Sequence, residues 1–170
     1  FYFLVSVVRY FIADVNYAAG QKNYQFFTRT QDSQYLISSF QSLQSAIKFN
    51  SSEPAILSEY AVSAAYLSSA AATKDIAIAA ANRAIALSPH HPNYYKSAAR
   101  VYILLSDLPA AAEVLTSAQK ISPTDPRLPY NLGLIYESLG KTDLAKENFQ
   151  KALDLKPDFP DAHTQPEKTP

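Results

Sequence analysis

Histidine is the side chain in this sequence best suited to hold a metal ion or move a proton, and three are present: His90, His91 and His163. A zinc site needs three or four ligands that converge on one point, and the chain has no Cys and no helix-spaced His pair. The sequence also contains no Gly-rich phosphate loop and no nucleophile elbow. We therefore predict no catalytic residue, no metal site and no cofactor, and we expect that the chain is not an enzyme.

The charge balance argues against a nucleic-acid partner, because 15 Lys and Arg are matched by 15 Asp and Glu without any basic block. Ala and Leu are frequent and only three Gly are present, which is typical of an all-helical protein. The absence of Cys excludes disulfides and leaves the cellular compartment undecided. Helices, rather than single reactive side chains, are thus the level at which this sequence is organised.

A period of 34 residues is visible in the sequence. It separates the members of two sets, which are Pro89, Pro123 and Pro157, and Ala84, Ala118 and Ala152. The preceding interval, from Ala46 to Ala84, is 38 residues. We place the four extra residues near Ser68–Thr73 and expect them to lengthen both helices of that hairpin by about one turn.

The clearest copy of this repeat is the segment from Pro129 to Asp158. It carries small, aromatic and proline residues in a fixed order: Leu132, Gly133, Tyr136, Gly140, Ala145, Phe149, Ala152 and Pro157. This order and spacing resemble the tetratricopeptide repeat, a helix–turn–helix unit of about 34 residues. The resemblance implies a right-handed, all-α solenoid of about four antiparallel helix hairpins.

The residues of this copy have separate packing roles. Gly133 is small where two helices must approach closely, and Tyr136 and Phe149 fill the space between them. Gly140 supplies a permissive backbone at the turn, and Pro157 ends the second helix. The predicted parts of the chain are an apolar start (1–12), a degenerate hairpin (13–53), a repeat with an insertion (54–91), two regular repeats (92–125 and 126–159) and a disordered tail (160–170).

Helix boundaries in the first half follow from capping residues. We predict one helix from Phe3 to about Phe27, a turn at residues 28–31, and a helix from Ser33 to Phe49 with Asp32 as its N-cap. Pro54 is placed to open the next helix, which we expect to extend over residues 55–71, with a further helix after Thr73. In the second half, Ser106 or Asp107 is expected to cap a helix that has Pro109 near its start.

The resemblance also implies where a ligand would bind. In tetratricopeptide arrays the first helix of each repeat lines the concave surface, so this function would be protein or peptide binding by a non-catalytic scaffold. The repeats that begin at Pro92 and Pro126 place six candidate residues on or beside that surface: Asn93, Lys96, Arg100, Arg127, Tyr130 and Asn131.

Three of these candidates are cations, Lys96, Arg100 and Arg127. Cations that share a groove favour a carboxylate or phosphate through charge-assisted hydrogen bonds, so we expect a partner with an acidic end. The set is partly similar to the carboxylate clamp of some family members, although Arg100 stands where that clamp prefers Asn. The alternative is ordinary exposed charge without a ligand.

The chain opens with an apolar run, residues 1–12, in which Arg9 is the only charge. A spanning helix needs roughly 20 apolar residues, so this run alone cannot cross a bilayer. Three interpretations remain open: the last turns of a truncated membrane helix, a core helix of the first repeat, or an interfacial segment. We expect a membrane-associated protein with a soluble repeat domain, or otherwise a cytoplasmic one.

A second resemblance concerns the apolar run and the residues after it, Arg9 to Asp14. Followed by a hairpin and then repeats, this segment looks like the end of the O-antigen ligase-like polysaccharide polymerases, some of which carry a C-terminal tetratricopeptide region. The resemblance covers about twenty residues plus the domain order. It implies an alternative function, an accessory domain of a membrane glycan polymerase or ligase whose catalytic portion lies upstream of Phe1.

Overall fold

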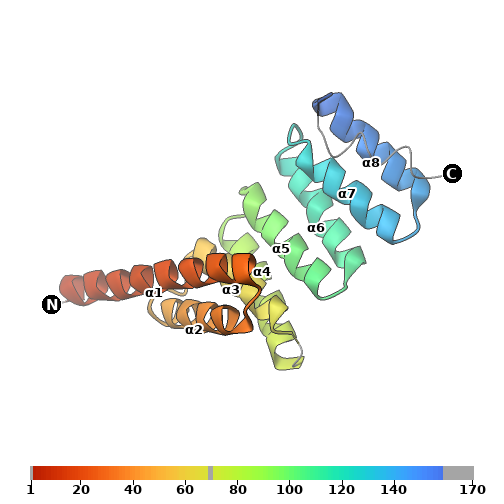
Figure 1. The fold of residues 1–170 in the computed structure, drawn as a ribbon. Helices are drawn as coiled ribbons and strands as arrows, with labels where there is room; N and C mark the ends of the chain where they lie inside the picture. The colour runs from red at the N-terminus through yellow and green to blue at the C-terminus, as the bar shows by residue number, and fades with distance from the viewer. Residues whose placement is uncertain (1, 69–70, 159–170) are drawn as a thin grey trace. The chain divides into compact units, whose positions relative to one another are not determined.

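The computed structural model describes residues 2–68 and 71–158, and within these ranges it consists of eight helices and no strand (Figure 1). Consecutive helices pair as hairpins, and the expected all-α solenoid is confirmed. The chain divides into two compact units, Phe1–Pro89 and His90–Pro170. The tail predicted at residues 160–170 lies outside the described residues.

The first unit contains the helices α1 (Tyr2–Thr30), α2 (Ser33–Phe49), α3 (Pro54–Tyr66) and α4 (Ala71–Leu87). Helix α1 pairs with α2, α3 pairs with α4, and α2 also packs on α3. At 29 residues α1 is much longer than α2, which has 17. One end of α1 therefore has no second helix of comparable length beside it.

The α1–α2 hairpin turns at Gln31 and Asp32. Helix α1 continues to Thr30, three residues beyond the predicted end, and Gln31 then reverses the chain with φ 57°. The Oδ1 atom of Asp32 accepts a hydrogen bond of 2.9 Å from the backbone N–H of Gln34, which confirms the predicted N-cap. The turn is thus shorter than expected because helical bonding persists through residues 28–30.

Gly20 explains how α1 and α2 approach each other. A Cβ atom built on Gly20 would lie 2.6 Å from the Cγ atom of Leu43, a side chain that is fully buried in α2. The hydroxyl of Ser39 donates a hydrogen bond of 2.9 Å to the carbonyl of Gly20 at the same crossing. An interior glycine that weakens a helix by about 1 kcal/mol is tolerated here because it allows this contact.

The prediction for the second hairpin was wrong in two respects. Helix α3 ends at Tyr66 rather than Ala71, because the backbone N–H of Leu67 bonds to the carbonyls of Ser63 and Ala64 and closes the helix. Helix α4 begins at Ala71, before Thr73. With 13 residues α3 is as long as α5, whereas α4 has 17 residues against 14 in α6, so the insertion lengthens only the second helix.

The second unit contains α5 (Pro92–Leu104), α6 (Leu108–Ile121), α7 (Arg127–Ser138) and α8 (Thr142–Leu155). Asp107 caps α6 through a hydrogen bond of 3.2 Å from the N–H of Ala110 to its Oδ1 atom, as predicted. Gly140 adopts φ 70° in the turn between α7 and α8, a conformation that other residues rarely accept.

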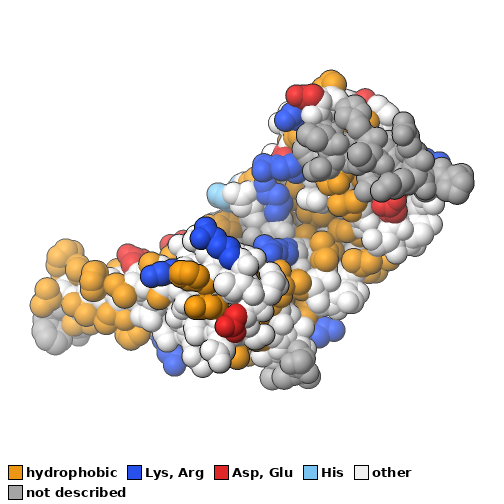
Figure 2. All heavy atoms as spheres, in the orientation of Figure 1, with side chains coloured by type: hydrophobic (Ala, Val, Ile, Leu, Met, Phe, Trp, Pro, Cys, Tyr) orange, Lys and Arg blue, Asp and Glu red, His pale blue; other side chains and the backbone are white. Residues whose placement is uncertain are grey.

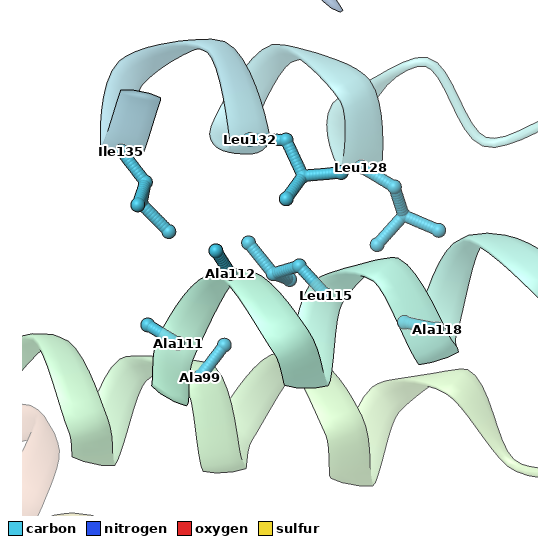
Figure 3. Close-up of a cluster of buried hydrophobic side chains, with 8 residues drawn as sticks. All are labelled: Ala99, Ala111, Ala112, Leu115, Ala118, Leu128, Leu132 and Ile135. Carbon is cyan, nitrogen blue, oxygen red and sulfur yellow. The ribbon is translucent and has the colours of Figure 1, made fainter. Parts of the chain in front are cut away.

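The core of the second unit lies where α6 meets α7 and α5 (Figure 3). The buried side chains that form it alternate between small and large, and they are Ala99, Ala111, Ala112, Leu115, Ala118, Leu128, Leu132 and Ile135. Burying one Leu or Ile side chain stabilises a fold by about 1.5–3 kcal/mol. These contacts hold α5 and α7 in fixed positions on either side of α6.

Helix α1 differs from the other helices in how much apolar surface it exposes. Residues near its N-terminus, such as Phe3, Leu4 and Phe11, are mostly accessible to solvent. Even so, no helix among the described residues is long and apolar enough to cross a membrane.

Candidate peptide-binding surface

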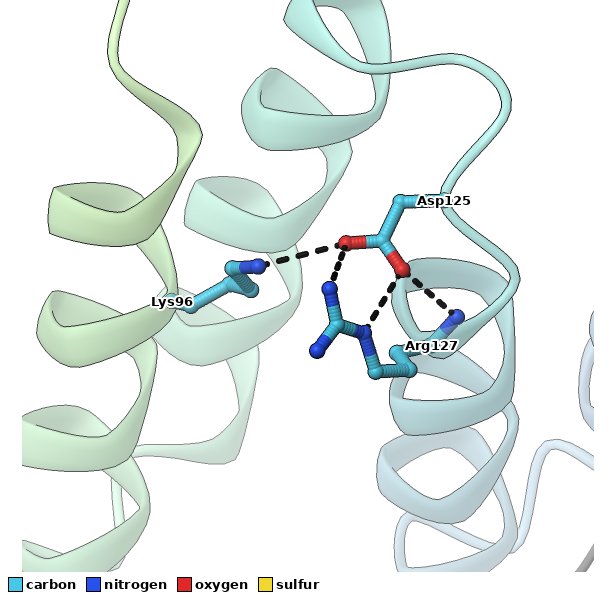
Figure 4. A network of polar contacts seen from close by, with 3 residues as sticks. All are labelled: Lys96, Asp125 and Arg127. Atoms are coloured by element: carbon cyan, nitrogen blue, oxygen red, sulfur yellow. Dashed lines mark hydrogen bonds and ion pairs between the residues drawn. The ribbon is translucent and has the colours of Figure 1, made fainter.

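The strongest polar cluster in the second unit joins α5 to the start of α7 through Asp125 (Figure 4). The Nζ atom of Lys96 lies 3.2 Å from Oδ2 of Asp125. The Nε and Nη2 atoms of Arg127 donate to Oδ1 and Oδ2 of the same carboxylate at 2.9 and 3.0 Å. Two cations that are distant in sequence therefore converge on one acidic side chain.

Local backbone geometry fixes Asp125 in this position. Its Oδ1 atom also accepts a hydrogen bond of 3.1 Å from the backbone N–H of Arg127, the first residue of α7. Its carbonyl accepts from the N–H of Leu128, also at 3.1 Å. Asp125 thus satisfies free amides at the start of α7, where a negative charge is favoured by the helix dipole.

The cluster changes the acidity of Asp125. Burial by itself would raise the pKa of this carboxyl, but hydrogen bonds from Arg127 and Lys96 and the charge of Lys96 outweigh it and lower the pKa to about 2. The same hydrogen bond and charge raise the pKa of Arg127. At neutral pH the three side chains carry two positive charges and one negative charge, which leaves a net charge of about +1.

Lys96 and Arg127 remain accessible to a ligand to different degrees. The side chain of Arg127 is 64% exposed and that of Lys96 is 24% exposed, whereas Asp125 is 11% exposed. A carboxylate from outside would therefore meet the guanidinium of Arg127 and the ammonium of Lys96 before it reached Asp125.

The other four predicted residues lie on the same two helices but have different surroundings. Asn93 and Arg100 are exposed on α5, and Arg100 follows Lys96 by one helical turn. Tyr130 is half-buried, and its ring packs against Phe149 with 5.8 Å between the ring centroids. Asn131 is also half-buried on α7. The structure joins two of the six predicted residues, Lys96 and Arg127, in one hydrogen-bonded cluster.

Asp125 is the residue of this cluster that sequence reasoning missed. Its sequence signal was an acidic residue directly before Pro126 and Arg127, at the predicted start of a helix. Such a residue is a typical helix cap, and an Arg two positions later can reach back to its carboxylate.

Apolar side chains extend the surface along the same helices. Ile103 on α5 is exposed, and Leu134 on α7 is half-buried. Glu137, near the end of α7, is exposed and acidic. A surface with a cationic end, an apolar middle and an acidic far end suits an extended chain with more than one kind of side chain.

The histidines and acids of the described residues show no arrangement for a metal ion, since no group of three or more His, Asp or Glu side chains converges there. The ring of His91 packs against that of Tyr94, with 4.7 Å between the centroids. His163 lies outside the described residues.

Family models identify the helix pairs. Residues 130–159 match one model described as "Tetratricopeptide repeat", and residues 70–126 match another with the same description. The chain belongs to the tetratricopeptide repeat family. No curated protein matches the chain.

Solved structures with tetratricopeptide repeats have a similar fold. The MamA protein has 18% identity and a TM-score of 0.68, over 89% of this chain and 77% of its own. TTC0263 from Thermus thermophilus, a thermophilic TPR protein, has 22% identity and a TM-score of 0.62, over 85% and 77%. YrrB, a TPR protein with an unusual peptide-binding site, has 16% identity and a TM-score of 0.69, over 91% and 74%. At these identities the likeness concerns the fold.

Proposed function

We propose that this tetratricopeptide repeat protein is a non-catalytic scaffold that holds a protein or peptide on the surface formed by α5 and α7. The family generally recognises partners through side chains of the first helices of its repeats. In this chain those helices carry the cationic cluster, an exposed Ile103 and a half-buried Leu134. The unusual peptide-binding site of YrrB gives a precedent on a similar fold.

The partner proposed for this surface has an acidic end. The observation that carries this proposal is the convergence of Lys96 and Arg127 on Asp125, because it shows that the two cations can bind one carboxylate together. Lys96 uses one of its three N–H groups on Asp125, and Arg127 uses one edge of its guanidinium. The remaining donors, together with Arg100, supply charge-assisted hydrogen bonds to a second carboxylate.

Binding of an acidic peptide tests this function directly. The probe is a fluorescein-labelled peptide that ends in two Asp residues with a free carboxyl group, and the readout is fluorescence anisotropy. The double variant Lys96→Ala/Arg127→Ala should weaken binding at least about 10-fold, since two charge-assisted contacts are lost. Lys151→Ala is the matched control, because Lys151 pairs only with Glu147 on α8 among the contacts described. Equal affinity of the double variant and the native chain would rule the function out.

A second proposed function is that of an accessory domain in an O-antigen ligase-like glycan polymerase or ligase of the membrane. It is favoured by the exposed apolar residues that precede Arg9 in α1. In this function the glycan chemistry belongs to a membrane portion upstream of Phe1, and the repeats position a partner or acceptor near the membrane. The gene sequence upstream of Phe1 tests it: about ten apolar segments would support it, and a start codon just before Phe1 would overturn it.

A further inference from the structure

The N-terminal turns of α1 are apolar on nearly every side. Phe3 is 82% exposed and Leu4 is 66% exposed, and Val5, Val7 and Val8 are exposed as well. Successive residues of a helix point about 100° apart, so these five side chains face in several directions around the axis. Hydrophobic side chains cover this end of the molecule in the space-filling view (Figure 2).

These turns extend beyond the helix that packs beside them. The Nη2 atom of Arg9 donates to the carbonyl of Phe49, the last residue of α2, at 3.4 Å. Because α2 runs antiparallel to α1 and ends opposite Arg9, it does not cover the residues before Arg9. A polar hollow of about 160 Å³ lies at this level, between residues 6–10 of α1 and residues 49–52.

The distribution of these side chains distinguishes between two possible occupants. A second helix would cover one stripe, and Leu4, Val8, Phe11 and Val15 have the spacing of such a seam. Phe3, Val5, Val7 and Tyr10 are also exposed, and they lie outside that stripe. A helix that is apolar all round is suited to being surrounded by an apolar medium, and lipid hydrocarbon is such a medium.

We infer that the turns from Phe3 to Val8 insert end-on into the hydrocarbon of one bilayer leaflet, with Arg9 and residues 50–52 at the headgroup level. Five helical steps correspond to about 8 Å, which is less than the roughly 15 Å of one leaflet. Arg9 reaches the headgroups from the side of α1 that faces α2, and Tyr10 and Phe11 lie at the interface, where aromatic side chains are favoured.

The charges at this end of the hairpin indicate which lipids are needed. Arg9 and Lys48 are positive, and Asp14 and Glu53 are negative, so the four side chains carry no net charge at neutral pH. Attraction to anionic lipids is therefore weak, and burial of apolar surface provides the driving force. Binding should occur on vesicles of phosphatidylcholine alone and should change little with salt.

This inference rests on the membrane association proposed with the second function and is independent of the peptide surface on α5 and α7. It adds a depth and an orientation. The position of each α1 residue relative to the lipid can be measured separately from binding itself, so vesicle binding without insertion of Phe3 would contradict the inference and leave membrane association standing.

Tryptophan fluorescence provides the measurement, because the chain contains no Trp and a single introduced indole reports its own surroundings. In the full chain, Phe3→Trp should shift its emission to the blue on phosphatidylcholine vesicles and should be quenched by lipids brominated along the acyl chains. Phe26→Trp, on a later turn of the same helix, is the matched control and should show neither change. Equal responses of the two probes, or no response at Phe3→Trp, would overturn the insertion.

A second variant separates lipid from a second copy of the chain. Phe3→Ser/Leu4→Ser removes two highly exposed apolar groups, so the fold should be unaffected and vesicle co-sedimentation should fall at least about 10-fold. Ile37→Ser, at an exposed site of α2, is the control and should sediment with vesicles as the native chain does. If Phe3→Trp shifted to the blue with rising protein concentration and no lipid, the occupant would be a second copy and the inference would be wrong.

Discussion

Gly133 of α7 and Phe149 of α8 touch directly, and a Cβ atom on Gly133 would lie 2.5 Å from Cε1 of the Phe149 ring. The two helices can approach this closely because one of them has no side chain at the crossing. The contact is the structural reason for two of the residues by which the repeat was recognised in the sequence.

Gly133→Ala should destabilise the protein by about 1–2 kcal/mol. Alanine improves helix propensity by about 1 kcal/mol, but overpacking against a buried aromatic ring costs about 1–3 kcal/mol. Urea unfolding measures the difference. Adding Phe149→Leu to the variant should reduce the effect of Gly133→Ala, and Ser138→Ala, at an exposed site on the same helix, should change stability by less than about 0.5 kcal/mol. A Gly133→Ala variant as stable as the native chain would contradict the proposed clash.

Asp107 and Lys141 occupy equivalent positions 34 residues apart, at the N-caps of α6 and α8. Asp107 accepts a capping hydrogen bond, whereas Lys141 makes none with its side chain. Asp107→Ala should therefore cost about 1 kcal/mol, and Lys141→Asp should stabilise the fold by about 0.5–1 kcal/mol. Thermal unfolding of the two variants should give melting temperatures that move in opposite directions, and a shift of both in one direction would contradict the comparison.

The low pKa of Asp125 predicts a loss of stability in acid. Its pKa in the folded chain is about 2 against an ordinary 3.8, so the folded state favours the ionised form. The stabilisation is fully present above about pH 4 and is lost as pH falls toward 2. We expect about 1–2 kcal/mol, because Arg127 is largely exposed and solvent weakens the pair. Urea unfolding at about pH 5 and pH 2.5 should show a smaller pH dependence for Asp125→Asn than for the native chain.

A hydrogen-bonded triad ties α1 to α3. Tyr17 and Gln21 of α1 donate to Oε1 of Glu59 on α3 at 2.9 and 2.7 Å. Tyr17→Phe removes one donor without changing the shape of the ring, so a loss of about 1 kcal/mol is expected from urea unfolding. The exposed Tyr35→Phe is the control and should have almost no effect. Equal stabilities for the Tyr17→Phe variant and the native chain would show that water replaces this contact without cost.

Much of the fold could be predicted because single residues carried unambiguous local signals. Asp32, Asp107 and Gly140 each fixed a turn, since a capping carboxylate and a positive φ leave few alternatives. The end of α3 was predicted wrongly because its sequence is rich in Ala, so propensity favoured continuation past Tyr66. Packing and turn formation, which depend on residues far along the chain, decided that boundary.

The candidate site was predictable only in part, for a related reason. The repeat register placed Lys96 and Arg127 on first helices, and the structure brings these two together. Asp125 lies in a turn, and the register assigned it no position on the inner surface. Its partners were legible only once the distance between α5 and α7 was known, because Lys96 is 29 residues away in sequence.

Asp125 also determines how a ligand would compete at this surface. It is held two residues from Arg127, so its carboxylate acts as a tethered ligand with an effective concentration of the order of millimolar or more. A free monocarboxylate must compete with this tethered group, so a single acidic contact should dissociate quickly. Only a partner attached at several points would stay bound for long, which suits a surface that assembles and releases its complexes rather than storing them.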